Sequence, residues 1–368
     1  MFREKKKEVL LALVTTFFIG LLGLILLEGY YWKNGYAFLV CEICRFHPKL
    51  GWDNIPGKTV GNEKVTYTTN SVGMRSEEVD FSKGHILVVG DSVAFGLGVN
   101  NDETVSYYLG KEENISALEY QVLNLGVSGW GIGQYYLNLK KHIDNLNPKM
   151  IVLIIYVTND LDDTRKDHHY GISKPMFYYQ NGRLINLNPT SSQFSCLNLH
   201  TRLKFAKHLI PLSLIESCQT KVIEREAASP TIIKLIDEIR TLGMQKNAPT
   251  LIVLSPALTV VESVGCMKSN PPELCLNYDT GFEAFYNYFQ KIMEKTKLPY
   301  VDFLQHLLDY EKEGAVKSLY VNSGKDIHHY SPKGNHILAQ AIAERLENDF
   351  DMNAPEPFRV YRGGLPVP

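Results

Sequence analysis

The stretch "HILVVGDS", residues 85–92, contains the pattern that decides the fold. Ile86 to Val89 form a continuous apolar run that stops at Gly90. Such a run, bounded by turn residues, is typical of a strand buried on both faces, and therefore of a parallel sheet. Similar runs recur at 120–126, 150–160, 250–256 and 299–303. The sequence therefore predicts several buried parallel strands.

Stretches with apolar residues at helical spacing lie between and after these runs, at 133–146, 230–243, 281–295 and 332–348. In the last of them, Ser331 is suited to cap the helix and Pro332 to be its first residue. Strands alternating with helices predict an α/β fold. We expect a three-layer α/β/α sandwich around a doubly wound, flavodoxin-like parallel sheet of about five strands.

Polar residues follow the predicted strands at the points where these strands end. Residues 90–92 end the first strand, 126–129 follow the second, and Asn159 and Asp160 end the third. The stretch "DIHH", 326–329, precedes the last helix. Active sites of doubly wound sheets lie beyond the carboxyl ends of the strands. We therefore expect these residues to meet at one edge of the sheet.

Ser92 is a candidate nucleophile, because a serine in a strand-to-helix turn can present its Oγ and its own backbone N–H to the same space. A histidine with Asp326 behind it would supply the base that a serine needs. Spacing alone leaves the choice between His328 and His329 open. The chain order Ser, Asp, His is that of α/β-hydrolases, but "GDSVA" is not their G-x-S-x-G turn.

With these blocks the sequence resembles the SGNH family of GDSL-type esterases and lipases, over roughly 85–345. The resemblance implies that "VVGDSVAFG" carries the nucleophile and backbone oxyanion donor Ser92. It also implies that "VLNLGVSGWG" carries the backbone oxyanion donor Gly129 and "YVTND" the amide donor Asn159. In "DIHHYSPKG" the D-x-x-H pattern falls on Asp326 and His329, and shifting the frame to His328 breaks the match with the residues that follow.

One departure is Val157, which stands where the family usually has glycine, two residues before the asparagine. We expect its bulk to narrow the floor of the site or to shift the Asn159 loop. The resemblance implies a serine-dependent hydrolase of acyl esters that works through an acyl-serine intermediate, with no cofactor and no metal. Three alternatives stay open: an O-acyltransferase that acetylates envelope polysaccharide, a catalytically inactive SGNH-fold binding or scaffold module, and a metal hydrolase.

The N-terminus predicts a membrane anchor. Residues 9–27 contain no charged side chain, and at ~1.5 Å per residue they span roughly 28 Å, about the thickness of a bilayer core. Arg3 and three lysines precede them, which predicts a cytoplasmic segment at 1–8. A cleaved signal peptide and a buried core helix fit less well. We expect a single-pass membrane protein whose catalytic domain lies outside the cytoplasm, on the bacterial inner membrane facing the periplasm.

The remaining boundaries follow from composition. We predict an irregular, mostly extended juxtamembrane lead-in at 28–80, a hydrolase domain at 81–350 with an insertion at about 161–229, and a C-terminal tail at 351–368. Within the insertion, Asn181 and Gly182 predict a hairpin at 176–187. In the lead-in, "LGWDNIPG" and "TTNSVGMRSEE" resemble a segment ahead of the catalytic blocks in membrane-anchored bacterial members.

Asp160, Asp162 and Asp163 are interpreted as a solvated loop, and His168 and His169 as polar loop residues.

The net charge and the spacing of the cysteines limit which partners and metal sites we expect. The net charge is −2 and there is no basic run beyond the first seven residues, which argues against nucleic acid. We expect an acyl-ester substrate on envelope polysaccharide, peptidoglycan or lipid. The six cysteines suggest disulfides, for which sequence allows fifteen pairings. A four-cysteine zinc site needs two close pairs, and only Cys41 and Cys44 are close enough.

Overall fold

The computed structural model describes residues 2–33, 43–169, 172–187, 222–269, 275 and 281–350. The predicted tail at 351–368 lies outside the described residues, as does the part of the predicted insertion at 188–221. Cys41, Cys196 and Cys218 also lie outside them. Among the described cysteines, Cys266 and Cys275 form a disulfide.

A five-stranded parallel sheet lies at the centre of the fold, in the order β13-β12-β7-β5-β6. Its strands are β5 (His85–Val89), β6 (Gln121–Asn124), β7 (Pro148–Tyr156), β12 (Thr250–Ser255) and β13 (Tyr300–Asp302). Every residue of β5 and β12 is buried, which explains why these strands are continuously apolar. In sequence order the strands are arranged 2-1-3-4-5, so the flavodoxin-like fold class is confirmed.

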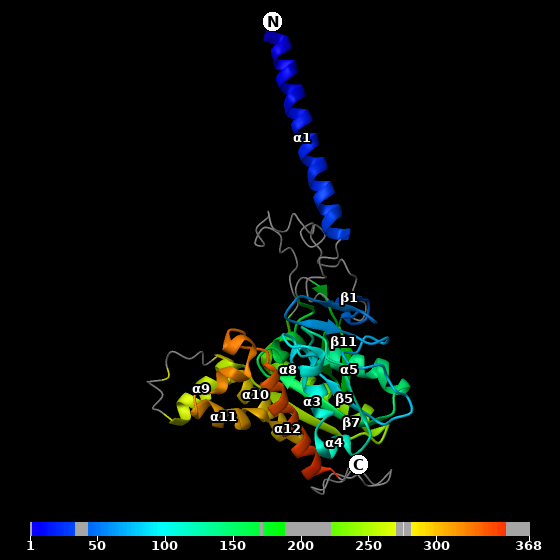
Figure 1. The fold of residues 1–368 in the computed structure, drawn as a ribbon, viewed down its shortest axis with the longest axis vertical. Helices are drawn as coiled ribbons and strands as arrows, with labels where there is room; N and C mark the ends of the chain where they lie inside the picture. The colour runs from blue at the N-terminus through cyan, green and yellow to red at the C-terminus, as the bar shows by residue number, and fades with distance from the viewer. Residues whose placement is uncertain are drawn as a thin grey trace.

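Helices cover both faces of the sheet (Figure 1). On one face α5 (Ile132–His142), α8 (Arg225–Met244) and α10 (Gly281–Thr296) pack against one another. On the other, α12 (Pro332–Asp349) packs against α3 (Val105–Leu109) and α11 (Phe303–Lys312). The connections between parallel strands cross over with a right-handed sense, and the direction in which strands are added reverses between β5 and β7. The connecting helices must therefore be divided between the two faces of the sheet. Helix α12 begins as expected, with the Ser331 hydroxyl accepting the Gly334 N–H at 3.3 Å.

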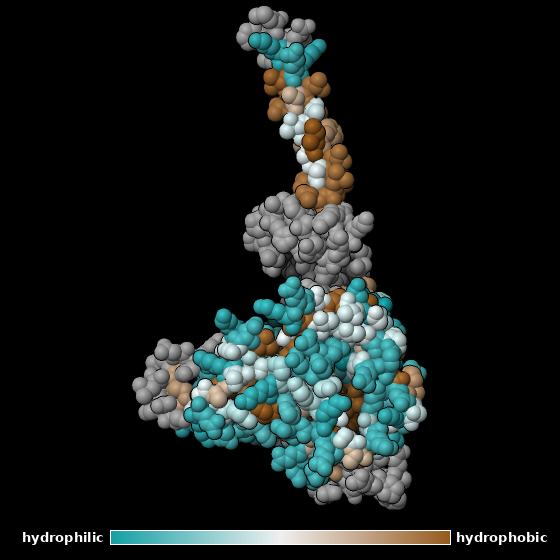
Figure 2. All heavy atoms as spheres, viewed as in Figure 1, coloured by the Kyte–Doolittle hydropathy of each residue, from teal (hydrophilic) through white to brown (hydrophobic). Residues whose placement is uncertain are grey.

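The N-terminal helix α1 (Phe2–Lys33) extends away from the rest of the molecule, and Figure 2 shows its apolar surface. Lys7–Leu27 has a mean hydropathy of 2.7, and none of it is buried against the protein. This stretch is long and apolar enough to cross a membrane. The helix continues to Lys33, so the first residues of the predicted lead-in, 28–33, are helical rather than irregular.

The lead-in is more regular than the sequence predicted. It forms two antiparallel hairpins, one of β1 (Cys44–His47) and β2 (Gly51–Asn54), the other of β3 (Thr59–Gly61) and β4 (Thr66–Thr68). Beyond the third central strand, β8 (His168–His169) pairs with β9 (Ile172–Ser173), and β10 (Phe177–Gln180) forms a hairpin with β11 (Arg183–Asn186). Among the described residues, the remaining α-helices are α2 (Ser92–Phe95), α4 (Glu113–Ser116), α6 (Asp160–Thr164) and α9 (Leu258–Ser269).

The loop after β6 runs directly against α2, and Gly126 permits this approach. A Cβ at Gly126 would lie 2.3 Å from the backbone nitrogen of Phe95 in α2. The Gly126 N–H donates to the Asn124 side chain at 2.9 Å, and the Val127 N–H donates to the Gly90 carbonyl at 3.2 Å. The loop and the turn that carries Ser92 therefore form one packed unit.

We expect Gly126→Ala to lower the free energy of unfolding by about 3 kcal/mol, because the added methyl group meets backbone that cannot rotate away. The matched control is Gly110→Ala, where the nearest heavy atom to a Cβ is 3.4 Å away. Urea denaturation followed by circular dichroism measures both variants. Equal stability of the two would contradict the close packing of the loop on α2.

Candidate active site

Ser92 lies at the sharp turn between β5 and α2. It is the first residue of α2, and Asp91 caps this helix by accepting the Val93 N–H at 2.9 Å. A Cβ at Gly90 would lie 2.8 Å from the Ile154 carbonyl oxygen on β7, so only glycine fits before the turn. Ser92 is 8% exposed, so only a small part of it meets solvent.

Three side chains form a continuous hydrogen-bonded chain that ends at Ser92. The Ser92 Oγ lies 2.9 Å from His329 Nε2, and His329 Nδ1 lies 2.8 Å from Asp326 Oδ2. The other carboxylate oxygen of Asp326 accepts the backbone N–H groups of His328 and His329, at 2.9 and 3.2 Å. The structure thus brings together the candidate nucleophile, the candidate base and the carboxylate that would orient this base.

The Asp326–His329 turn is held by contacts with the end of β12. The Leu258 N–H donates to the Ile327 carbonyl at 2.9 Å, and the Tyr330 hydroxyl donates to the Pro256 carbonyl at 2.8 Å. The His329 carbonyl accepts the Val321 N–H at 2.9 Å. These bonds fix the turn relative to the sheet edge.

The charge on Asp326 is stabilised locally. Partial burial raises the pKa of Asp326, but the hydrogen bond and positive charge of His329, with the two backbone N–H groups, lower that pKa to about 2. Asp326 is therefore ionised at neutral pH. An ionised Asp326 holds the His329 tautomer that leaves Nε2 free to accept a proton from Ser92.

His328 has a different partner, the hydroxyl of Tyr156 at the end of β7. The Tyr156 oxygen lies 2.7 Å from His328 Nδ1. Burial lowers the pKa of His328, and the positive charge of His329 lowers it further. Of the two adjacent histidines, the structure therefore places His329 against Ser92 and His328 against Tyr156.

Three candidate oxyanion donors lie around this turn. Within the described part of the chain, neither the Ser92 N–H nor the Gly129 N–H donates a hydrogen bond to protein. Gly129 has a φ of 75°, which favours glycine. The Asn159 amide lies beside Asp91, with Nδ2 at 3.4 Å from Asp91 Oδ2. Val157 is fully buried and its side chain packs in the hydrophobic core.

Acidic residues beneath the site correct the prediction of a solvated loop. Asp160 and Asp163 are buried, and Asp160 accepts the Tyr135 hydroxyl at 2.5 Å and the Tyr156 N–H at 2.8 Å. Asp163 pairs with His169 at 3.0 Å, and His169 is half-buried rather than free in a loop. Among the described residues, no group of histidine, cysteine and acidic side chains could hold a metal ion.

Arg75, in the lead-in motif "GMRSEE", holds the carboxyl end of α2, the helix that begins at Ser92, and sequence reasoning did not single it out. It is 1% exposed and donates to the carbonyls of Phe95 and Val99, at 2.8 and 2.5 Å. Burial lowers its pKa to about 10, so the guanidinium stays charged at neutral pH. A buried cation among carbonyls at the end of α2 is favourable for the helix dipole.

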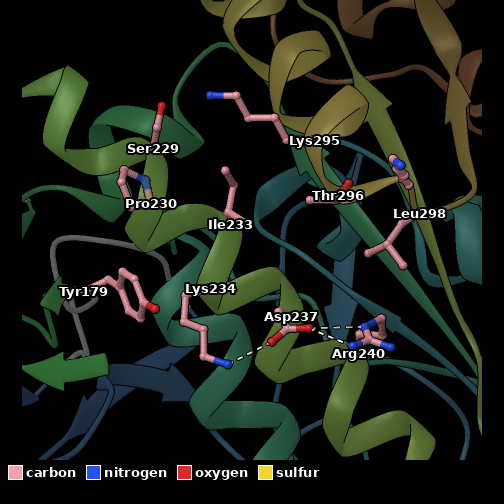
Figure 3. A pocket seen from close by; sticks show the side chains of 11 residues that line it. Tyr179, Ser229, Pro230, Ile233, Lys234, Asp237, Arg240, Lys295, Thr296 and Leu298 are labelled. Atoms are coloured by element: carbon pink, nitrogen blue, oxygen red, sulfur yellow. Dashed lines mark hydrogen bonds and ion pairs between the residues drawn. The ribbon is translucent and has the colours of Figure 1, made fainter. Parts of the chain in front are cut away.

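A cavity of about 600 Å³ lies apart from this site, between α8, the hairpin residue Tyr179 and the end of α10 (Figure 3). Within it, Asp237 forms ion pairs with Lys234 and Arg240, both at 2.8 Å. No residue of the Ser92, His329 and Asp326 chain lines it. The cavity is therefore not where a substrate would meet Ser92.

Comparison with known proteins gives structural neighbours only, since no family model and no curated protein matches the sequence. The chain is similar to TesA, with 14% identity, a TM-score of 0.39 and coverage of 72% of this chain and 98% of that one. An acetyl xylan esterase, AlAXEase, is 14% identical with a TM-score of 0.41, over 71% and 98%. The lipase/acylhydrolase from Enterococcus faecalis is 13% identical with a TM-score of 0.39, over 72% and 95%.

We expect His329→Ala to abolish labelling of Ser92 by a fluorophosphonate, which reacts with activated serines, because the base is lost. His328→Ala, the matched neighbour, should keep the labelling rate within about tenfold of the wild type, since His328 bonds Tyr156 rather than Ser92. In-gel fluorescence over time measures both rates. Loss of labelling in His328→Ala alone would reverse the assignment.

A second prediction concerns Asp91, whose carboxyl group is fully buried. Burial raises its pKa to about 6, while the Val93 N–H and the His329 charge oppose that rise. Because the folded state binds this proton more tightly than the unfolded state, the Asp91 contribution to stability falls as pH rises between about 4 and 6. We expect Asp91→Asn to remove this fall, measured as denaturation midpoints at pH 4.5 and 7.5. Parallel changes in variant and wild type would contradict it.

Proposed function

We propose that the chain is a membrane-anchored, serine-dependent hydrolase of acyl esters, of the SGNH type. The observation that carries the proposal is the hydrogen-bonded chain from Ser92 through His329 to Asp326. A domain without catalysis has no physical need for this arrangement next to unused backbone donors. The geometry therefore favours an enzyme over a binding or scaffold module.

In the proposed reaction, the Ser92 Oγ attacks the ester carbonyl carbon while His329 Nε2 takes the hydroxyl proton. His329 then gives that proton to the leaving alcohol, and an acyl-Ser92 intermediate remains. Water, deprotonated by His329, attacks this intermediate and releases the carboxylic acid. Asp326 stays ionised throughout and stabilises the imidazolium that forms twice.

The Ser92 and Gly129 N–H groups and the Asn159 amide would stabilise the negative oxygen of each tetrahedral intermediate. Neither N–H group donates to a protein acceptor within the described residues, so both are available to a substrate oxygen. The loss of one such donor costs on the order of 10²–10³ in kcat. The mechanism uses side chains and backbone of this chain alone, with no cofactor.

We place the catalytic domain outside the cytoplasm, with α1 as the anchor and the basic N-terminus inside. The apolar length of Lys7–Leu27 supports the anchor, and the lysines before it support this orientation. The Cys266–Cys275 disulfide supports an oxidising compartment. An anchored domain would reach esters of envelope carbohydrate or lipid, which we propose as the substrate class.

The test is fluorophosphonate labelling of the full-length chain in detergent. We expect the wild type to be labelled and Ser92→Ala to be unlabelled, with labelling unchanged by a chelator. In Asn159→Ala the labelling rate should fall on the order of 10²–10³, because one oxyanion donor is lost. Circular dichroism controls for folding. An unlabelled folded wild type, or labelling that persists in Ser92→Ala, would refute the proposal.

A further inference from the structure

The lead-in hairpin of β1 and β2 lies between the anchor and the catalytic domain, and its residue Trp52 is fully buried. Trp52 forms no hydrogen bond with Ser92, His329 or Asp326. Its indole N–H instead donates to the carbonyl of Ser128 at 2.9 Å. The bond joins residues that are 76 positions apart.

The Ser128 carbonyl belongs to the same peptide unit as the Gly129 N–H, the proposed oxyanion donor. In a planar trans peptide the C=O and the N–H point in opposite directions. A donor that fixes the carbonyl on one side therefore fixes the direction of the N–H on the other. Glycine at 129, with φ of 75°, would otherwise let this peptide rotate with little steric resistance.

Further hydrogen bonds hold the hairpin and the loop together. The Trp130 indole N–H donates back to the Trp52 carbonyl at 3.1 Å, and the Asn54 amide donates to the Gly126 carbonyl at 3.1 Å. On the next helix, the Gln134 amide donates to the Leu50 carbonyl at 2.7 Å. Trp52 thus sits in a hairpin that is held at several points, so the loss of the Trp130 bond alone leaves the Asn54 and Gln134 bonds and the bond from Trp52 to Ser128 in place.

We propose that Trp52 is a positioning residue for the reaction, acting through the Ser128–Gly129 peptide. Its N–H keeps the Gly129 N–H directed toward the oxyanion, and the hydrogen bond at the carbonyl polarises the same amide. This inference rests on the proposed function. It gives the "LGWDNIPG" motif of the lead-in a role in catalysis.

The test is Trp52→Phe in the full-length chain in detergent, which keeps an aromatic ring and removes the N–H. We expect kcat for p-nitrophenyl acetate and the fluorophosphonate labelling rate to fall about tenfold, with KM within about twofold. The loss is smaller than for removal of a donor, because the Gly129 N–H remains but is held less well. A merely structural role would lower the melting temperature without this split between kcat and KM.

Trp130→Phe is the matched control, because it also removes a buried indole N–H between the hairpin and the loop but leaves the Ser128 carbonyl bonded. We expect its kcat to stay within about threefold of the wild type. If Trp52→Phe does not fold, β-(3-benzothienyl)alanine at position 52 replaces the N–H by sulfur in a ring of the same shape, with the same expected tenfold loss.

The outcomes separate the two proposals. If the wild type is active and kcat falls equally in Trp52→Phe and Trp130→Phe, or falls in neither, the role of Trp52 is overturned. The proposed function then still stands. A wild type that the fluorophosphonate does not label would overturn both. A loss of kcat confined to Trp52→Phe, or to its benzothienyl replacement, supports the role of Trp52.

Discussion

The parallel pairing of β5 with β7, and of β7 with β12, places the carboxyl ends of three strands at one edge of the sheet. The hydrogen bond between Ser92 and His329 depends on this placement. Ser92 follows β5 directly, while His329 belongs to a turn tied to the residues after β12. Because the two are 237 positions apart, only the sheet can bring them within 2.9 Å.

Below this edge the protein buries polar groups that a simple core would exclude. Asp160 is fully buried, and its two oxygens are satisfied by the Tyr135 hydroxyl and the Tyr156 backbone. Such a network offsets the cost of desolvation only when its members are bonded. Tyr156 extends the network upward to His328, so the layer under the site also keeps this second histidine away from Ser92.

The lead-in is part of the same architecture rather than a spacer. Arg75 supports the end of the nucleophile helix, and Trp52 supports the loop that carries Gly129. Both side chains are buried to 1% exposure or less, and both donate to backbone carbonyls. The lead-in thereby contributes to the order of the site.

From the sequence alone follow the five central strands, the N-terminal helix, the helices α5, α8, α10 and α12, and the edge at which Ser92, Gly129, Asn159 and Asp326 gather. Local physics suffices for these, because apolar runs, glycine turns and the Ser331–Pro332 helix start are encoded by neighbouring residues. The choice of His329 over His328 needed either a family pattern or the structure, since Asp326 can reach both by spacing. Helices α9 and α11 and the hairpins of the lead-in were missed. The residues of α9 and of these hairpins show no strong period, whereas α11 is amphipathic and its pattern was overlooked.

The environment of the site follows from the folded chain and not from local sequence. The burial of Asp91, Asp160 and Asp163, and the bonds that Trp52 and Arg75 make, join segments far apart in sequence. From sequence, a charged or polar residue is predicted to be solvated when its neighbours in sequence are also polar, as in "NDLDD". Whether it is solvated depends on which distant backbone and hydroxyl groups pack around it, and that is a property of the folded chain.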